Sequence, residues 1–214
     1  KRTTNGEGLV SMMTLEELQS LDAAWHFSTD GGATFPYRGK GIRIPTLGEV
    51  LALAPRHRIL IEMKEGEKIA ETTVAAIREA DAVHRCILAA APPGYIAEGR
   101  RLEPGMATCC DILSAASLLA ALRSDAWADY APEHRALALS PSLQKRFQLT
   151  PDELQKIRQK GILVIFFTVN QQDEMRQLLD MGVDSILTDY PSRLWEVIRS
   201  EEHTSEIQSR QSIS

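Results

Sequence analysis

The chain has 214 residues, a formal net charge of −5 at pH 7, 43% hydrophobic residues and 25% charged residues. This composition is typical of an ordinary soluble protein with one domain or a small pair of domains. The acidic balance argues against nucleic acid or an anionic membrane surface as the main partner. No apolar run approaches the ~20 residues of a membrane-spanning helix.

Three cysteines, Cys86, Cys109 and Cys110, have neither the spacing of a zinc site nor the pattern of a disulfide framework. The two neighbouring cysteines would alternate faces on a strand. We therefore predict that all three are buried small hydrophobic residues.

Three helices are predicted by one capping-box spacing, in which a threonine is followed three residues later by a glutamate. The first predicted helix starts after Thr14, and the second runs from Thr46 to the residues before Pro55. The third runs through Lys160, and Gly161 ends it. The three pairs are Thr14 with Glu17, Thr46 with Glu49 and Thr150 with Glu153.

Residues 25–41 are predicted to form a loop, because they contain four glycines and Pro36. Four aromatic residues lie in the same stretch: Trp25, Phe27, Phe35 and Tyr37. Such a loop could be the lip of a binding site, or it could cover the core. It could suit an acyl chain as well as core packing, and these alternatives stay open.

The rest of the chain alternates short apolar strands with helices, and this pattern predicts an α/β fold with parallel strands. The predicted strands are residues 59–64, 86–90, 106–110, 136–139, 162–168 and 183–188, and residues 124–135 are predicted to be a loop. The predicted helices of this part, besides the one after Thr150, are residues 67–80, 95–103, 112–122, 171–181 and 191–198. No glycine-rich phosphate loop follows a strand, and polar residues lie at several strand ends. We therefore favour an incomplete TIM (β/α)8-type barrel, with about six of its eight strands present, over an open sheet.

The strand at residues 59–64 carries Glu62 and Lys64 on one face, together with Leu60. At the carboxyl end of a parallel strand these two charges would face a pocket. The alternative is a strand end that emerges into solvent with ordinary surface charges. Asn170 and Asp189 also follow strands, but a helix cap and a turn explain them equally well.

Five segments, in this order, resemble the glycerophosphodiester phosphodiesterase family. They are Arg2-Thr3-Thr4-Asn5-Gly6, Ile44-Pro45-Thr46-Leu47, Ile61-Glu62-Met63-Lys64, Phe167-Thr168-Val169-Asn170 and Thr188-Asp189-Tyr190-Pro191. The resemblance covers about residues 1–198. It implies a TIM barrel that uses Mg²⁺ or Ca²⁺ to hydrolyse glycerophosphodiesters to an alcohol and glycerol 3-phosphate.

The resemblance also implies roles for three residues. Glu62 matches the metal ligand of the family's Ile-Glu-x-Lys strand, and Lys64 matches the lysine near the substrate phosphate. Phe167 stands where the family usually has tryptophan, so it would bind substrate as an apolar wall without an indole N–H.

The family takes its acid and base from histidines in a His-Arg-Gly and a His-Asp, with a Glu-x-Asp between them. None of these motifs is present, so no catalytic residue is assigned. The chain has five histidines, which we predict to be solvated or in loops: His26, His57, His84, His134 and His203. We expect the C-terminal three-quarters of a parent enzyme, inactive and poorly stable in isolation.

Residues 199–214 have no apolar periodicity and resemble the translation of a sequencing-library adapter. A disordered polar terminus is the alternative. We therefore predict a barrel domain at residues 1–198 followed by a non-native or disordered tail.

Other functions stay open. One is a non-catalytic barrel module that binds a phosphorylated ligand or a partner, and another is a lysophospholipase D-like lipid phosphodiesterase. The expected ligand is thus a glycerophosphodiester or a lysophospholipid. The location, cytoplasmic or secreted, is left open, because no signal peptide is visible and we expect the chain to start inside a longer protein.

Overall fold

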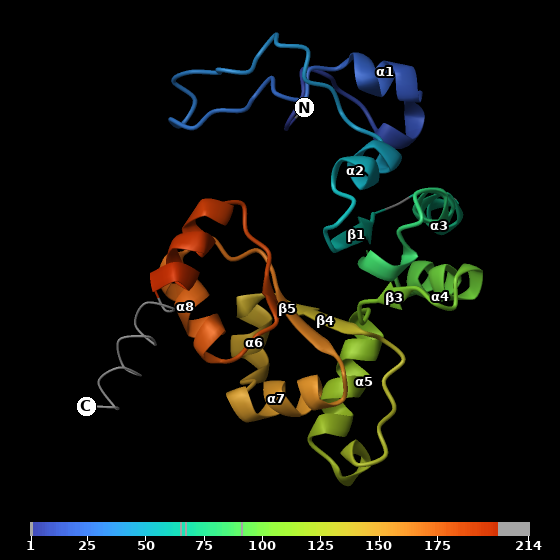
Figure 1. Cartoon of the computed structure of the whole chain (residues 1–214), viewed down its shortest axis with the longest axis vertical. Coiled ribbons are helices and arrows are strands. Elements are labelled where there is room, and N and C mark those ends of the chain that lie inside the picture. The colour runs from blue at the N-terminus through green and yellow to red at the C-terminus, as the bar shows by residue number, and fades with distance from the viewer. Residues whose placement is uncertain (1, 65, 67, 91, 201–214) are drawn as a thin grey trace. The chain divides into compact units, whose positions relative to one another are not determined.

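The computed structural model describes residues 2–64, 66, 68–90 and 92–200. The chain divides into two compact units. The first unit comprises residues 1–58 and 65–85, and the second comprises residues 59–64 and 86–214. Figure 1 labels the α-helices and most of the strands of the two units.

The first unit contains three short α-helices and two 3-10 helices: η1 (Val10–Met12), α1 (Leu15–Ser20), α2 (Leu47–Leu53), α3 (Ile69–Glu79) and η2 (Val83–Arg85). The predicted capping boxes of α1 and α2 are confirmed, because each threonine hydroxyl accepts a hydrogen bond from the glutamate N–H and each glutamate accepts one from the threonine N–H. α2 packs against α3. Leu51, Val74 and Ile77 are fully buried and form the apolar centre of this unit.

Residues 25–41 form no helix or strand, as predicted. The Phe27 and Tyr37 rings pack on each other with centroids 5.4 Å apart, and each ring is about half exposed. Arg38 stacks over the rings of Trp25 and Phe35. Trp25 and Phe35 are partly buried and Phe27 and Tyr37 are exposed, so the loop's two alternatives, a binding lip and a cover over the core, both stay open.

The second unit contains all six strands of the described residues, as the sequence predicted. They are β1 (Ile59–Met63), β2 (Cys86–Ala90), β3 (Ala107–Thr108), β4 (Ala136–Leu139), β5 (Leu163–Phe166) and β6 (Ser185–Ile186). They form two parallel three-stranded sheets, in the orders β1-β2-β3 and β4-β5-β6. A single parallel bridge between Cys109 and Ala136 joins the two sheets. The chain therefore has the predicted α/β architecture with parallel strands.

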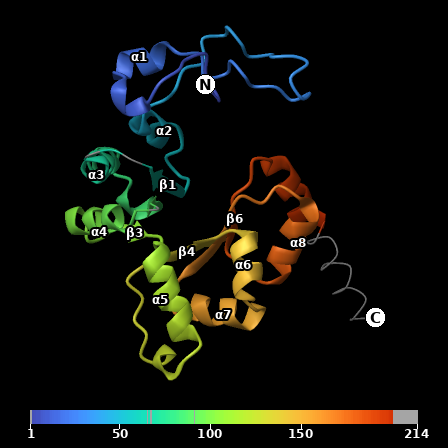
Figure 2. The same cartoon turned by 180° about the vertical axis from the view of Figure 1, so that it is seen from behind.

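Helices separate the strands of the second unit. They are α4 (Pro93–Leu102), α5 (Ile112–Leu122), α6 (Pro141–Phe147), α7 (Pro151–Gln159) and α8 (Gln172–Asp180), with η3 (Asp125–Trp127) after α5. Residues 191–200 are helical as well, two residues beyond the predicted end. In both whole-chain views α5, α6 and α7 lie along β4 and β5, and β6 is labelled in the view from behind (Figures 1 and 2).

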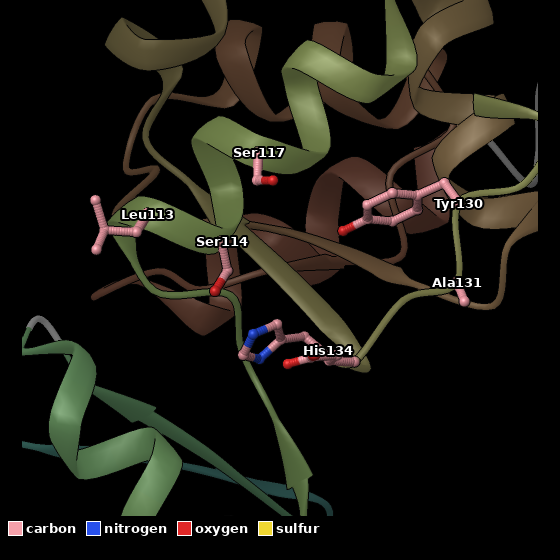
Figure 3. Close-up of a pocket in the computed structure, with 7 residues that line it drawn as sticks. Leu113, Ser114, Ser117, Tyr130, Ala131 and His134 are labelled. Carbon is pink, nitrogen blue, oxygen red and sulfur yellow. The ribbon is translucent and has the colours of Figure 1, made fainter. Parts of the chain in front are cut away.

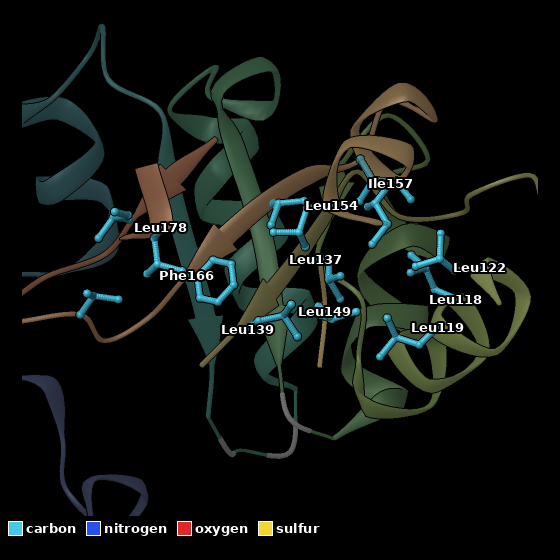
Figure 4. Close-up of a cluster of buried hydrophobic side chains, with 14 of the residues drawn as sticks. Leu118, Leu119, Leu122, Leu137, Leu139, Leu149, Leu154, Ile157, Phe166 and Leu178 are labelled. Carbon is cyan, nitrogen blue, oxygen red and sulfur yellow. The ribbon is translucent and has the colours of Figure 1, made fainter. Parts of the chain in front are cut away.

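The core of the second unit lies between these helices and one face of β4 and β5 (Figure 4). Leu137 and Leu139 of β4 alternate with Ala136 and Ala138, which point to the opposite face. The side chains packed on the helical side include Phe166, Leu118, Leu122, Leu154, Ile157 and Leu178. Apolar periodicity thus explains which face of the sheet the helices cover.

Three predictions need correction. No helix was predicted at α6, although Ser140 caps it and Pro141 occupies its first turn. β3 and β6 have two residues each, fewer than the predicted ranges. α4 begins at Pro93, two residues before its predicted start, because proline is tolerated in a first turn.

Candidate functional site

A pocket of about 300 Å³ lies at the carboxyl ends of the strands of the second unit. Every strand contributes to it, either with its last residues or with those that follow it. The lining residues are Leu60, Glu62, Ala89, Ala90, Cys109, Cys110, Ala138, Phe167, Thr168 and Leu187. This is the edge at which enzymes with parallel β/α folds place their chemistry.

The pocket exists because the inner face of the sheets carries small side chains. Below the pocket, Cys109, Ala136 and Ile165 form a buried apolar cluster. Ala89 and Ala138 lie where barrel interiors more often carry valine, isoleucine or leucine. Methyl side chains leave space above the cluster, so the pocket has an apolar floor.

Glu62 lines the pocket, and its Oε1 lies 2.7 Å from the Nζ of Lys64. The strand places Leu60 and Glu62 on the pocket side and Met63, which is 2% exposed, on the other, as predicted. The Glu62 side chain is 45% exposed and that of Lys64 is 75% exposed, so the pair lies at the mouth. A pair this exposed contributes about 0–1 kcal/mol to stability. Stability therefore does not explain why these two charges are placed together.

Phe167 and Leu187 form the opposite, apolar side of the mouth, and each is about two-fifths exposed. Beyond them, Asn170 connects the ends of β5 and β6. Its Oδ1 accepts hydrogen bonds from the Thr188 hydroxyl and the Asp189 N–H, and its Nδ2 donates to an Asp189 carboxylate oxygen. Asn170 is not the helix cap, because Gln171 precedes α8. Its hydrogen bonds fix the turn after β6.

Cys109 and Cys110 both line the pocket, which the sequence did not predict. Cys86 and Cys109 are buried, as predicted, whereas Cys110 is only partly buried. Burial raises the pKa of both pocket thiols to about 12, so they are uncharged near neutral pH. They therefore add polarizable apolar surface to the pocket rather than a nucleophile.

The described residues do not by themselves form a metal site. Mg²⁺ and Ca²⁺ take six or more oxygen ligands, several of them from carboxylates, carbonyls or water. Glu62 is the one carboxylate among the described residues that line the pocket. Within the described ranges, no group of three or more His, Cys, Asp or Glu residues could hold a metal ion.

The predicted place of the histidines, in solvent or in a loop, holds for His134. It lies in a loop and, in addition, is buried, with an exposed fraction of 3%. Its Nδ1 lies 3.0 Å from the Thr108 hydroxyl. His26, His57 and His84 are exposed, whereas His203 lies outside the described residues. None of the four described histidines lines the pocket that contains Glu62.

The structure brings three of the five predicted motif segments to this pocket or next to it: residues 61–64, 167–170 and 188–191. The first two segments belong to the first unit. There Thr4 is buried, and its hydroxyl accepts a hydrogen bond from the N–H of Gly6. Asn5 accepts one from the N–H of Asp22. These residues stabilise the turn before α1.

Fold and site together define a parallel α/β protein with a pocket at the carboxyl ends of its strands. The model of the glycerophosphoryl diester phosphodiesterase family matches residues 1–193. A glycerophosphodiester phosphodiesterase of Caldanaerobacter subterraneus is 30% identical over 208 residues, which cover 92% of this chain and 76% of that protein. One of Bacillus subtilis is 28% identical, and the match covers 89% of this chain and 66% of that protein.

Solved structures of phosphodiesterases have the same fold as this chain. A glycerophosphoryl diester phosphodiesterase domain from Mycobacterium tuberculosis superposes with a TM-score of 0.73 at 20% identity, covering 91% of this chain and 79% of that one. An Oleispira antarctica phosphodiesterase, solved with its product sn-glycerol-3-phosphate, superposes with a TM-score of 0.67 at 23% identity. The match covers 92% of this chain and 75% of that one. The fold is thus TIM-barrel-like. The chain belongs to the glycerophosphodiester phosphodiesterase family, whose members are phosphoric diester hydrolases.

No helix in the described part of the chain is long and apolar enough to span a membrane.

Proposed function

We propose that the second unit carries part of the substrate site of a metal-dependent hydrolase that cleaves glycerophosphodiesters to an alcohol and glycerol 3-phosphate. The observation that carries this proposal is the Glu62–Lys64 pair at the mouth of the pocket. Family membership supports the same reaction class.

Lys64 is proposed to bind the substrate phosphate. Its ammonium group is exposed, and an ammonium stabilises the charge that develops on a phosphoryl oxygen during hydrolysis. To reach a phosphate, Lys64 would exchange its contact with Glu62 for one with the substrate. Phe167 is proposed to bound the substrate as an apolar wall.

Glu62 is proposed as one ligand of Mg²⁺ or Ca²⁺, because hard cations prefer carboxylate oxygens. One carboxylate is too few, so the remaining ligands would come from outside the residues described. Acid and base are also needed for phosphodiester hydrolysis. We assign neither within this chain. We propose that the acid and the base are the histidines of the family's His-Arg-Gly and His-Asp motifs, and that both belong to a segment outside these 214 residues.

The barrel itself is proposed to be incomplete here. Residues 1–198 would contribute about six of its eight strands, and β1 and β6 would pair with the others. Without those partners, two strand edges would be exposed. We therefore expect this chain alone to be inactive and poorly stable. The proposed barrel excludes residues 199–214. Of this tail, residues 201–214 lie outside the described residues.

A second candidate substrate is a lysophospholipid, and the apolar pocket favours it. Leu60, Ala89, Ala138 and Phe167 offer contacts to a hydrocarbon chain rather than hydrogen bonds to a polar alcohol. Hydrolysis of lysophosphatidylcholine at a higher kcat/KM than glycerophosphocholine, by the same complete protein, would establish this candidate over the first.

The test uses the complete protein, obtained by resequencing the locus on both sides of this reading frame. An upstream His-Arg-Gly, Glu-x-Asp and His-Asp would support a hydrolase. A frame that starts near Lys1 would instead support a module that binds phosphorylated ligands without turnover.

Variants of the complete protein then test the two residues with glycerophosphocholine. Lys64→Met should lower kcat/KM by roughly 10²–10³-fold, and Glu62→Gln should abolish metal-dependent turnover. Glu71→Gln and Lys156→Met change the same residue types at exposed helical positions and serve as controls. Full metal-dependent turnover by Glu62→Gln would refute its assignment as a metal ligand. Metal-dependent turnover by the 214-residue chain alone would refute the proposal that it is inactive.

A further inference from the structure

A second cavity, of about 420 Å³, lies beside α5, outside the pocket that contains Glu62 (Figure 3). Its lining residues are Leu113, Ser114, Ser117, Tyr130, Ala131, Glu133 and His134. The cavity shares no lining residue with the pocket at the strand ends. A volume of this size is within the range of small-molecule sites in proteins.

Three hydroxyl groups of this cavity are available to a ligand. Ser114 and Ser117 lie one turn apart on α5, so both side chains are on the same helix face. Figure 3 shows the Tyr130 hydroxyl directed toward α5. Within the described residues, the Ser117 and Tyr130 hydroxyls form no hydrogen bond, whereas the Ser114 hydroxyl bonds the Asp111 carboxylate and its oxygen can still accept a hydrogen bond. The Tyr130 ring also stacks on Trp127, with centroids 5.4 Å apart, which holds it in place.

His134 supplies a further polar group with an incomplete set of hydrogen bonds. Its Nδ1 pairs with the Thr108 hydroxyl, whereas its Nε2 is buried and has no hydrogen-bond partner among the residues described. A buried nitrogen without a hydrogen-bond partner destabilises the structure. A ligand hydroxyl that reached this nitrogen would supply the missing hydrogen bond.

The charges of the cavity indicate that its ligand is uncharged. Burial lowers the pKa of His134 and raises that of Tyr130, so both rings are neutral near neutral pH. The Glu133 carboxylate is compensated by Arg100 at 3.1 Å. Among the described residues that line this cavity, no unpaired cation is left to bind a phosphate, and a metal cluster is absent within the described ranges. An ionic ligand would lose its hydration without gaining a counter-charge.

We propose that this cavity binds a neutral polyhydroxy compound, such as a polyol or a monosaccharide, through Ser114, Ser117, Tyr130 and His134. Several hydroxyl groups on one small ligand match these several polar groups, and Leu113 and Ala131 contact its C–H surface. The site is separate from the proposed phosphodiester site, and it does not depend on that function.

The test is a titration of the ¹⁵N-labelled 214-residue chain with glycerol, inositol and glucose, followed by NMR. At least one of them should shift the His134 Nε2 resonance saturably, whereas glycerol 3-phosphate should not. Tyr130→Phe and Ser117→Ala should each weaken the affinity about two- to tenfold, the value of one neutral hydrogen bond. Ser192→Ala removes an exposed helical serine elsewhere and should leave the affinity unchanged.

Three results would overturn the proposal. The first is that none of the three compounds shifts the resonance saturably. The second is that glycerol 3-phosphate shifts the His134 Nε2 resonance saturably and with an affinity as high as theirs. The third is that Tyr130→Phe and Ser117→Ala both bind like the unaltered chain. Because Ser117 is exposed and alanine favours helices, Ser117→Ala tests the site without unfolding α5.

Discussion

Replacement of Arg85 by methionine should destabilise the first unit strongly. Arg85 is 8% exposed and donates hydrogen bonds to three backbone carbonyls. Its Nη2 lies 2.9 Å from the Leu51 oxygen, and its Nη1 lies 2.9 Å from that of Ala54 and 3.3 Å from that of His57. These carbonyls lie at and beyond the end of α2, where a helix leaves carbonyl groups unpaired. Arg85 therefore caps α2 from a distant part of the chain.

Methionine would fill much of the space but donate no hydrogen bond. Each carbonyl that stays buried without a donor costs about 1–3 kcal/mol. The bond to Leu51 is fully buried and the other two are partly buried, so we expect a loss of about 3 kcal/mol. The measurement is urea unfolding, combined with hydrogen exchange of the amides of α2 and α3.

Arg56→Met is the matched control, because Arg56 is an exposed arginine of the same unit. It should change the free energy of unfolding by about 0.5 kcal/mol or less. Arg85→Lys should recover only part of the loss, since an ammonium group lacks the planar fork that reaches separate carbonyls. If Arg85→Met and Arg56→Met unfold at the same urea concentration, Arg85 is not the cap of α2.

Three further predictions concern the second unit. Hydrogen bonds from Arg123 lower the pKa of Glu153 below its ordinary value of 4.5. The ionised Glu153 therefore adds to the free energy of unfolding above pH 4.5, and this contribution is lost as the pH falls through the lowered pKa. Glu153→Gln should therefore flatten the acid side of the stability profile, at a cost of about 1 kcal/mol at pH 7, and an unchanged acid profile would contradict this. Cys109 and Cys110 should react with iodoacetamide near pH 7 much more slowly in the native chain than in urea, as mass spectrometry can show; equal rates would mean that neither thiol is protected. Gly161→Ala should cost about 1 kcal/mol in thermal unfolding, because Gly161 has φ +77°, and an unchanged Tm would refute that strain.

Much of the fold could be predicted from local patterns. The capping boxes at Thr14, Thr46 and Thr150 depend on hydrogen bonds within four residues, so the sequence alone contains them. β2 and α5 match their predicted ranges, because apolar content and flanking turns define both ends. Helix α6 was missed because its polar residues 144–146 hide the apolar pattern, although Ser140 and Pro141 are a sequence signal for its start.

The site could be predicted only in part. Strand alternation places Glu62 toward the pocket, and the motif identifies it. The thiols of Cys109 and Cys110 were missed, because their pocket position depends on how β3 and β4 are joined, which no local pattern encodes. The burial of His134 follows from its contact with Thr108, 26 residues earlier in the chain, so it could not be predicted from neighbouring residues.

The seam between the two sheets, where β3 meets β4, has a consequence for the width of the pocket. β3 and β4 are held together by two backbone hydrogen bonds, from Cys110 N–H to the Ala136 oxygen at 2.8 Å and from Arg135 N–H to the Thr108 oxygen at 2.9 Å. The pocket that contains Glu62 takes six lining residues from one side of this seam and four from the other. Its width is thus set by main-chain atoms, which side-chain substitutions leave in place. Evolution or engineering could widen the pocket by altering the length of the strands at the seam, while Glu62 and Lys64 keep their geometry on β1.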